Sequence, residues 1–344
     1  MQNIHGGDIY TNPIEYDFSV NINPLGVPEG VRNALHEAVN DCSNYPDIAS
    51  GKLKNAVSNI LSIPKEYLLF GNGASELFMA IVHAIKPEKT VIPIPSFYGY
   101  EYATIANNGD IIYYETKIEN NFHVAEDILT VLKDDINLLF LANPNNPTGN
   151  LISRDLLLKI LRHCMDRDIL VVLDECFIEF AGKELSMINE IYSFSNLIII
   201  RAFTKIYSIP GVRLGYLICS NSSILNTIKI NLPEWNISVF AQKAGCVCTR
   251  LDGFIEKTID YINIERQFLI NGLENIGYKV ISGNANFLLI YSKQPLYESL
   301  LEKKILIRDC TNFKGLAKGY YRISIKSRKE NEILLNAIGE INTK

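Results

Sequence analysis

Apolar residues along the chain form short runs that alternate with stretches of helical periodicity. The runs are rich in Val, Ile, Leu and Phe and predict seven strands, at residues 66–71, 90–95, 110–115, 136–143, 169–175, 196–203 and 212–220. Helical patterns lie between most of them, at residues 74–85, 100–109, 128–132 and 153–168. Strands that alternate with helices are joined by crossover connections, so this region predicts a mostly parallel sheet with helices on both faces.

The two ends of the chain have different patterns. An arm rich in Asn, Gly and Pro precedes helical patterns at 31–39 and 50–61, and a helical region at about 238–275 precedes strand-like runs at 279–283, 286–292 and 320–326. A chain of 344 residues is long enough for two domains. We expect an arm at 1–28, a large domain at 45–240, and a smaller α+β domain formed by 29–44 and 241–344.

Composition and charge narrow the class of protein. Apolar residues make up 47% and charged residues 21%, which is typical of a globular protein, and a formal net charge of −5 offers no basic face to nucleic acid or membrane. Seven cysteines without a CxxC pair predict reduced thiols and no metal site. The chain has no signal-peptide pattern and no apolar stretch of about 18 residues, so we expect a soluble cytoplasmic protein.

Polar residues follow two of the predicted buried strands. Asn143, Asn145 and Asn146 come after one strand, and Asp174 ends the next. Ligands of such sheets bind outside the carboxyl ends of the strands. A buried carboxylate without a cationic partner is unfavourable, so Asp174 suggests a ligand atom that carries positive charge.

Two further segments suit the same ligand. Gly73, Ala74 and Ser75 precede a helix, where backbone N–H groups and the helix dipole favour an anion such as phosphate. Lys205 and Arg213 follow another strand, around a turn that contains Pro and Gly. Pyridoxal phosphate has a phosphate, a protonated ring nitrogen, a ring hydroxyl and an aldehyde that a lysine can attack, so this one cofactor explains all these positions.

The ordered motifs GNGASE, NPNNPTG, DECF and FTKIYSIPGVRLGY resemble those of fold-type I pyridoxal phosphate enzymes, in the branch of histidinol-phosphate aminotransferase. HGG, DFSVNINPLG, WNISVFAQ and ILIRDCTNFKGLAKGYYRISI are more similar to the L-threonine-O-3-phosphate decarboxylases of cobalamin biosynthesis. The resemblance extends from His5 to about Lys326. It implies an α/β fold with a large domain around a mostly parallel seven-stranded sheet and a smaller α+β domain.

The resemblance also implies roles for the cofactor residues. Lys205 would form the Schiff base, Asp174 would contact the pyridinium nitrogen, and Asn146 would contact the ring hydroxyl and the substrate carboxylate. The cofactor phosphate would be bound by Gly73, Ala74, Ser75, Thr204 and Arg213. Phe97 would stack on the ring, and Tyr45 would reach the cofactor phosphate of the other subunit in a homodimer.

For a small phosphorylated amino-acid substrate, the resemblance assigns the α-carboxylate to Arg322 and the phosphate to His5, Asn23 and Arg308. Each role has a structural alternative. Asp174 could cap a helix, Phe97 could be ordinary core and Tyr45 could pack beside Pro46. Arg322 and Arg308 could each form a salt bridge, and His5 could lie in a mobile terminus.

Two positions depart from patterns common among these relatives. Ala202 stands where a Ser or Thr often donates to the cofactor phosphate, so one hydrogen bond is absent or is supplied elsewhere. Phe177 stands where histidinol-phosphate aminotransferases have a Tyr that donates to the ring oxygen. Because Phe also fits the decarboxylase pattern, Phe177 favours decarboxylation.

We therefore expect decarboxylation of O-phospho-L-threonine, or of the analogue phosphoserine. The alternative within the enzymes is histidinol-phosphate:2-oxoglutarate transamination. A third hypothesis is a non-catalytic regulatory protein that keeps the fold, but the presence of Lys205 and the lack of a basic helix-turn-helix pattern argue against it.

Overall fold

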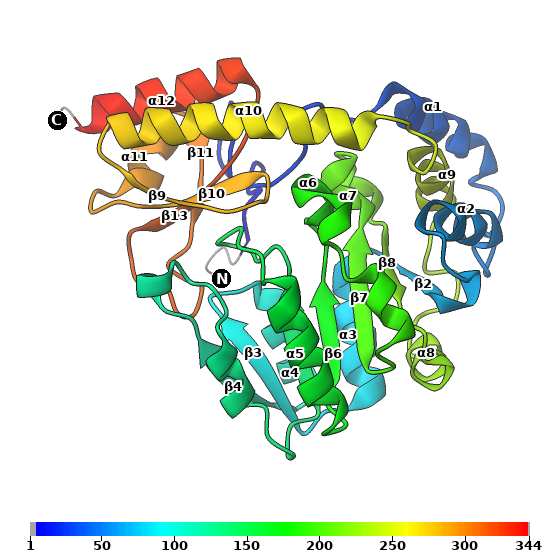
Figure 1. The fold of residues 1–344 in the computed structure, drawn as a ribbon. Coiled ribbons are helices and arrows are strands. Elements are labelled where there is room, and N and C mark those ends of the chain that lie inside the picture. Colours follow the sequence, from blue (N-terminus) through cyan, green and yellow to red (C-terminus); the bar gives the residue numbers. More distant parts are fainter. Residues whose placement is uncertain (1–4, 343–344) are drawn as a thin grey trace.

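The computed structural model describes residues 5–342, and its largest element is a seven-stranded sheet (Figure 1). The strand order is β2-β8-β7-β6-β5-β3-β4. The strands are β2 (Leu68–Gly71), β3 (Lys89–Ile94), β4 (Asp110–Glu115), β5 (Leu138–Ala142), β6 (Leu170–Asp174), β7 (Leu197–Ala202) and β8 (Gly215–Ile218). β8 runs antiparallel to both of its neighbours, β2 and β7, and the other neighbouring strands of this sheet are parallel. The predicted mostly parallel sheet is confirmed.

Helices cover both faces of this sheet, whose central strands are mostly apolar. Every residue of β6 and β7 is buried, as expected for parallel strands with packed layers on both faces. The flanking helices are α3 (Ala74–Ile85), α4 (Tyr98–Ala106), α5 (Arg154–Met165) and α8 (Ser222–Lys229), and two short helices, α6 (Ile178–Ala181) and α7 (Phe203–Ile206), follow β6 and β7. The helix predicted at 128–132 was wrong, because this short segment forms a 3₁₀ turn at Glu126–Thr130.

A second, antiparallel sheet lies in the C-terminal part of the chain. Its order is β12-β13-β10-β9, with β9 (Lys279–Ser282), β10 (Phe287–Tyr291), β12 (Arg308–Asp309) and β13 (Tyr320–Ser324). Helices α10 (Phe254–Asn275), α11 (Leu296–Glu302) and α12 (Arg328–Asn342) lie over it, and α10 extends toward the large sheet (Figure 1). A short parallel pair, β1 (Tyr16–Asp17) with β11 (Ile305–Leu306), attaches the N-terminal segment to this part of the molecule.

A group of three helices packs beside β2 and β8 (Figure 1): α1 (Glu29–Ala38), α2 (Gly51–Leu61) and α9 (Val239–Cys248). The region expected to be helical at 238–275 is therefore two helices, α9 and α10. The domain boundaries expected at residues 28, 44 and 240 remain a prediction. The three helices pack together although they come from segments on both sides of the boundaries at residues 44 and 240.

The two sheets share one continuous hydrophobic core. Phe177, which follows β6, packs edge to face on Phe287 of β10 with 5.2 Å between ring centroids. Polar residues at the carboxyl ends of the large sheet therefore face residues of the small one. This arrangement places the candidate site between the two sheets.

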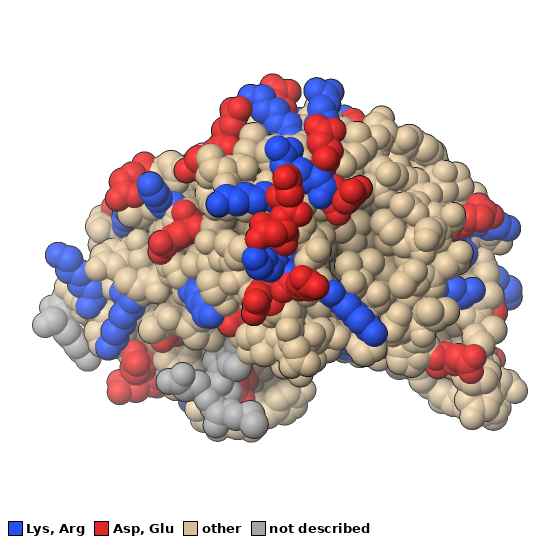
Figure 2. Space-filling view, turned by 90° about the horizontal axis from the view of Figure 1, so that it is seen from below, with Lys and Arg blue, Asp and Glu red and all other residues tan. Residues whose placement is uncertain are grey.

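The distribution of charged residues on the surface and the free cysteine thiols are consistent with the composition of the chain. On the face shown in Figure 2, Lys and Arg lie interspersed with Asp and Glu. All seven cysteines are free in this structure. Within residues 5–342, no helix combines the length and apolarity needed to cross a bilayer, and no group of His, Cys, Asp and Glu could hold a metal ion.

Candidate active site

A cavity of about 280 Å³ lies where β5, β6 and β7 end and α3 and α4 begin, and residues of the small sheet close its other side. Most of the candidate residues predicted from the sequence line it: His5, Ala74, Ser75, Phe97, Asn146, Asp174, Thr204, Lys205, Arg213, Arg308 and Arg322. These residues come from segments far apart in the sequence. The fold therefore brings together the groups that the motifs suggested.

The first turn of α3 forms one end of the cavity. Its N-cap is Gly73, which provides no side-chain hydrogen bond and has a φ of 76°. A Cβ at this position would lie 2.4 Å from Nη2 of Arg213, so only glycine allows the guanidinium to come this close. With Ala74 and Ser75 in the cavity wall, uncapped N–H groups and a cation combine into a site for an anion.

Asp174 lies at the end of β6 and is 9% exposed. Burial raises the pKa of its carboxyl, and hydrogen bonds from Cys176 and Tyr100 and the charge of Lys205 oppose this effect. The hydroxyl of Tyr100 donates to Oδ2 at 2.6 Å, and the backbone N–H of Cys176 donates to Oδ1 at 2.9 Å. A cationic group in the cavity would further stabilise the carboxylate. Sequence reasoning missed Tyr100, although it lies one helical turn after Phe97 and could have been found from that spacing.

Lys205 lies in the helical turn that follows β7. Burial lowers the pKa of its amine, and the positive charge of nearby Arg213 acts in the same direction. The ammonium donates to Oγ1 of Thr204 at 3.2 Å. An amine with a lowered pKa is a nucleophile for carbonyl groups, which is the chemistry expected of this residue.

Arg322 enters the cavity from β13. Its guanidinium donates to the backbone carbonyl of Ser19 at 2.7 Å and to Oδ1 of Asn146, while its Nε is buried without a partner. Burial lowers the pKa of Arg322 to about 10, so the side chain remains cationic at neutral pH. A planar cation with an unpaired donor suits a carboxylate.

A second polar group, here called the Arg308 cluster, consists of His5, Arg308 and Asn312 in the same cavity wall. Arg308 is 7% exposed and donates to the Asp309 carbonyl and to Oδ1 of Asn312, each at 2.7 Å. Burial holds the pKa of His5 below its ordinary value, and the charges of Arg308 and Arg322 add to the effect. These effects favour the neutral form of the His5 imidazole.

Asn23 does not line the cavity. Its side chain donates to the Ile206 carbonyl at 2.7 Å and to Oγ1 of Thr258 at 2.9 Å, and it accepts from the Leu25 N–H at 3.0 Å. These bonds hold the segment after Lys205 in place. Two residues earlier, Asn21 lines the cavity and its Oδ1 is buried without a partner. The structure thus places Asn21, and not Asn23, in the cavity wall.

Tyr45 also lies outside the cavity of its own chain. It is 81% exposed and its ring lies 4.9 Å from that of Trp235. An exposed tyrosine cannot serve this cavity, but it is free to reach another subunit. Its expected role in a homodimer stays a prediction.

The cavity wall also contains apolar residues, among them Phe97, Ala202 and Phe177. Phe97 contacts Tyr100 edge to face at 5.7 Å, and Ala202 and Phe177 stand at the positions where the sequence departs from its relatives. Neither Ala202 nor Phe177 has a side chain that can donate a hydrogen bond, whereas Thr204 and Asn146 in the same cavity wall do.

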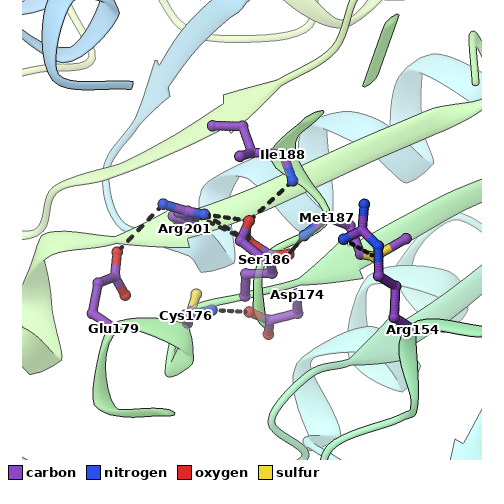
Figure 3. Close-up of polar contacts among 9 residues, drawn as sticks. Arg154, Asp174, Cys176, Glu179, Ser186, Met187, Ile188 and Arg201 are labelled. Atoms are coloured by element: carbon purple, nitrogen blue, oxygen red, sulfur yellow. Dashed lines mark hydrogen bonds and ion pairs between the residues drawn. The ribbon is translucent and has the colours of Figure 1, made fainter. Parts of the chain in front are cut away.

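A buried charged network supports the strand that carries Asp174 (Figure 3). Glu175 accepts hydrogen bonds from Arg201 at 2.9 Å, from Ser186 at 2.7 Å and from the Met187 N–H at 2.8 Å. Glu179 approaches the same guanidinium at 3.9 Å. Glu175, the residue after β6, therefore has a structural role, and it points away from Asp174 as neighbouring residues of extended chain do.

The fold and the site together define an enzyme class, and the comparisons agree. The chain belongs to the aminotransferase class I and II family, whose family model matches residues 13–338. It is 37% identical to a provisionally named threonine-phosphate decarboxylase of Caldanaerobacter subterraneus subsp. tengcongensis, over 97% of this chain and 92% of that protein. It is 33% identical to the threonine-phosphate decarboxylase of Salmonella typhimurium, over 95% of this chain and 91% of that protein.

A solved structure is similar as well. The histidinol-phosphate aminotransferase of Clostridium acetobutylicum superposes with a TM-score of 0.89 and 33% identity, over 95% of this chain and 99% of that one. The recognition of this branch from sequence motifs is therefore confirmed, and both kinds of relative are comparably similar to this chain.

The cavity fits the cofactor that the resemblance implies. The cradle of Gly73 and Arg213 suits a phosphate, the buried carboxylate of Asp174 suits a protonated ring nitrogen, and the amine of Lys205 suits an aldehyde. No group in this set conflicts with pyridoxal phosphate.

Proposed function

We propose that the protein is a pyridoxal phosphate-dependent decarboxylase that converts O-phospho-L-threonine to (R)-1-aminopropan-2-yl phosphate and CO₂ for cobalamin biosynthesis. The observation that carries the proposal is the presence of two separate basic groups in one cavity, Arg322 with Asn146 and the Arg308 cluster, facing Lys205 and Asp174. A substrate with both a carboxylate and a phosphate satisfies both groups.

The cofactor would be held by residues of the large sheet. The α3 N-terminus, Thr204 and Arg213 would bind its phosphate, Phe97 would stack on its ring, and Asn146 would contact the ring hydroxyl. When bound, pyridoxal phosphate supplies an electron sink for a bond broken at the substrate Cα. Asp174 would keep the ring nitrogen protonated, and the hydroxyl of Tyr100 would keep Asp174 ionised.

The substrate would be oriented by the small sheet. Arg322 would bind the α-carboxylate, and Arg308 and His5 would bind the phosphate. Holding both ends fixes which bond at Cα breaks. Loss of CO₂ leaves Cα in need of a proton, and Lys205 is the buried amine that can deliver it.

Histidinol-phosphate transamination is the second candidate, because the solved aminotransferase is as similar in sequence as the Salmonella decarboxylase. Its substrate also carries a phosphate that the Arg308 cluster could bind. Phe177 favours decarboxylation, since the tyrosine hydroxyl typical of the aminotransferases is absent. The greater identity to the Caldanaerobacter protein points in the same direction.

We further propose a homodimer in which Tyr45 of one subunit contacts the cofactor phosphate of the other. The high exposure of Tyr45 supports this arrangement. A phenolic hydroxyl from the partner would compensate in part for the hydroxyl that Ala202 lacks.

A panel of substrates tests the reaction. The enzyme loaded with pyridoxal phosphate is incubated with O-phospho-L-threonine, O-phospho-L-serine or histidinol phosphate, each with and without 2-oxoglutarate, and CO₂ and amine products are measured. We expect CO₂ from phosphothreonine without any acceptor. Product formation only from histidinol phosphate with 2-oxoglutarate would support the second candidate instead.

A further inference from the structure

The loop between β12 and β13, residues 310–319, reaches from the small sheet to the large one. Gly315 has a φ of 82°, and a Cβ there would lie 3.2 Å from the Ile94 carbonyl carbon and from the Pro95 nitrogen. The loop therefore packs directly against the end of β3. It also contains Asn312, the partner of Arg308.

Lys314 of this loop makes polar contacts with the large domain. Its ammonium donates to the hydroxyl of Tyr113 at 2.6 Å and lies 4.3 Å from the centre of that ring. It also forms an ion pair with Oε1 of Glu101 at 3.1 Å. The Lys314 side chain is 49% exposed, whereas that of Glu101 is 15% exposed.

Glu101 and Lys314 both line the cavity, together with the Arg308 cluster. Glu101 belongs to α4, the helix that begins directly after Phe97. A poorly exposed carboxylate in the wall of a cavity that accepts phosphate is unfavourable, because the like charges repel in a region of low dielectric. Lys314 is the cation that neutralises this carboxylate.

We propose that Lys314 determines specificity for a dianionic side chain by cancelling the charge of Glu101 in the cavity wall. With the pair formed, the positive charge of Arg308 dominates this part of the cavity. When Lys314 is absent, the negative charge of Glu101 is not neutralised and opposes the positive charge of Arg308. The proposal rests on the proposed function, since it concerns the phosphate of that substrate, and it assigns Lys314 a role beyond holding the loop closed.

The test compares three variants, Lys314→Met, Glu101→Gln and the double variant, by steady-state kinetics with O-phospho-L-threonine. Lys314→Met should raise KM about tenfold with little change in kcat, as expected for one charge-assisted interaction. Glu101→Gln should lower KM by about two- to threefold, and the double variant should return KM to within about threefold of the wild-type value. Lys318→Met, an exposed cation of the same loop that does not line the cavity, serves as the control and should match the wild type.

A simple latch between the domains predicts a different pattern. If Glu101→Gln raises KM as much as Lys314→Met and the double variant shows no recovery, the proposal is overturned. Calorimetric titration of the same proteins measures ligand binding independently of turnover. The ligands are O-phospho-L-threonine and, as the unphosphorylated control, L-threonine. If the enzyme releases no CO₂, the proposed function is contradicted. If the variants nevertheless bind O-phospho-L-threonine, but not L-threonine, in the same order of affinity, the proposed role of Lys314 is still supported. Equal affinities in all variants overturn it.

Discussion

The hydroxyl of Tyr100 donates to Oδ2 of Asp174 across 2.6 Å, in a part of the protein where both side chains are almost completely buried. Burial and the neighbouring Asp174 raise the pKa of Tyr100 well above its ordinary value, so the phenol keeps its proton. Tyr100 is therefore a positioning residue. It supplies a permanent donor that favours the ionised form of Asp174.

Replacing Tyr100 with Phe should weaken the enzyme most in acidic solution. The hydrogen bond lowers the pKa of Asp174, so its loss raises that pKa and shrinks the pH range in which the carboxylate is ionised. We expect the acidic limb of the kcat profile to move to higher pH and kcat at neutral pH to fall about tenfold. Tyr102→Phe, on the same helix and 55% exposed, is the matched control. If kcat of Tyr100→Phe falls by the same factor at every pH, with no shift of the acidic limb, the positioning role is contradicted.

Phe177→Tyr tests whether the missing hydroxyl matters. Phe177 lines the cavity, so a tyrosine there could donate to the ring oxygen of the cofactor. We expect the Kd for pyridoxal phosphate to fall about fivefold, as for one added hydrogen bond. Equilibrium dialysis measures it. An unchanged or raised Kd would show that the ring oxygen lies beyond reach of this position.

Glu179 should make stability depend on pH. One carboxylate oxygen is buried without a partner, and burial raises the pKa of Glu179 to about 7, although Arg201 opposes the shift. Ionisation is then easier in the unfolded chain, so the free energy of unfolding contributed by this group falls as the pH rises from about 4.5 to about 7.

Glu179→Gln removes this titration while keeping the shape of the side chain. Between pH 5 and pH 8, the wild type should lose about 2 kcal/mol of unfolding free energy relative to the variant, measured by urea denaturation. The exposed Glu184→Gln serves as the control. Parallel pH profiles for Glu179→Gln and wild type would mean that Glu179 ionises normally in the folded protein.

Subunit mixing tests the role of Tyr45. Tyr45→Ala and Lys205→Ala should each be nearly inactive as homodimers. If Tyr45 acts across the interface, each mixed dimer contains one site with both Tyr45 and Lys205. Random exchange makes about half of the dimers mixed, so about a quarter of the wild-type activity should return. No recovery after verified subunit exchange would contradict the cross-subunit contact.

The sequence predicted the large sheet well because its strands are continuous apolar runs, and parallel strands buried on both faces require such runs. It also indicated that Asp174 and Lys205 lie near the carboxyl ends of strands, since Asp174 ends β6 and Lys205 comes three residues after β7. The 3₁₀ turn at Glu126–Thr130 was missed because a short apolar periodicity resembles a helix until tertiary packing decides.

The remaining site residues depend on contacts between distant segments. Asn21 and Asn23 lie in one irregular segment, and no periodicity there indicates which amide faces the cavity. Lys314 belongs to a polar loop whose partner, Glu101, is far away in sequence. Such pairs arise only when the small sheet docks onto the large one, so motif spacing could not predict them.

The central claim is decarboxylation without an amino acceptor. It is tested most directly by incubating the enzyme and pyridoxal phosphate with O-phospho-L-threonine labelled with ¹³C in the carboxylate, in the absence of any keto acid. We expect one equivalent of ¹³CO₂ for each (R)-1-aminopropan-2-yl phosphate formed, with both products absent for Lys205→Ala. Retention of the label in the substrate, or turnover that begins only when 2-oxoglutarate is added, would contradict it.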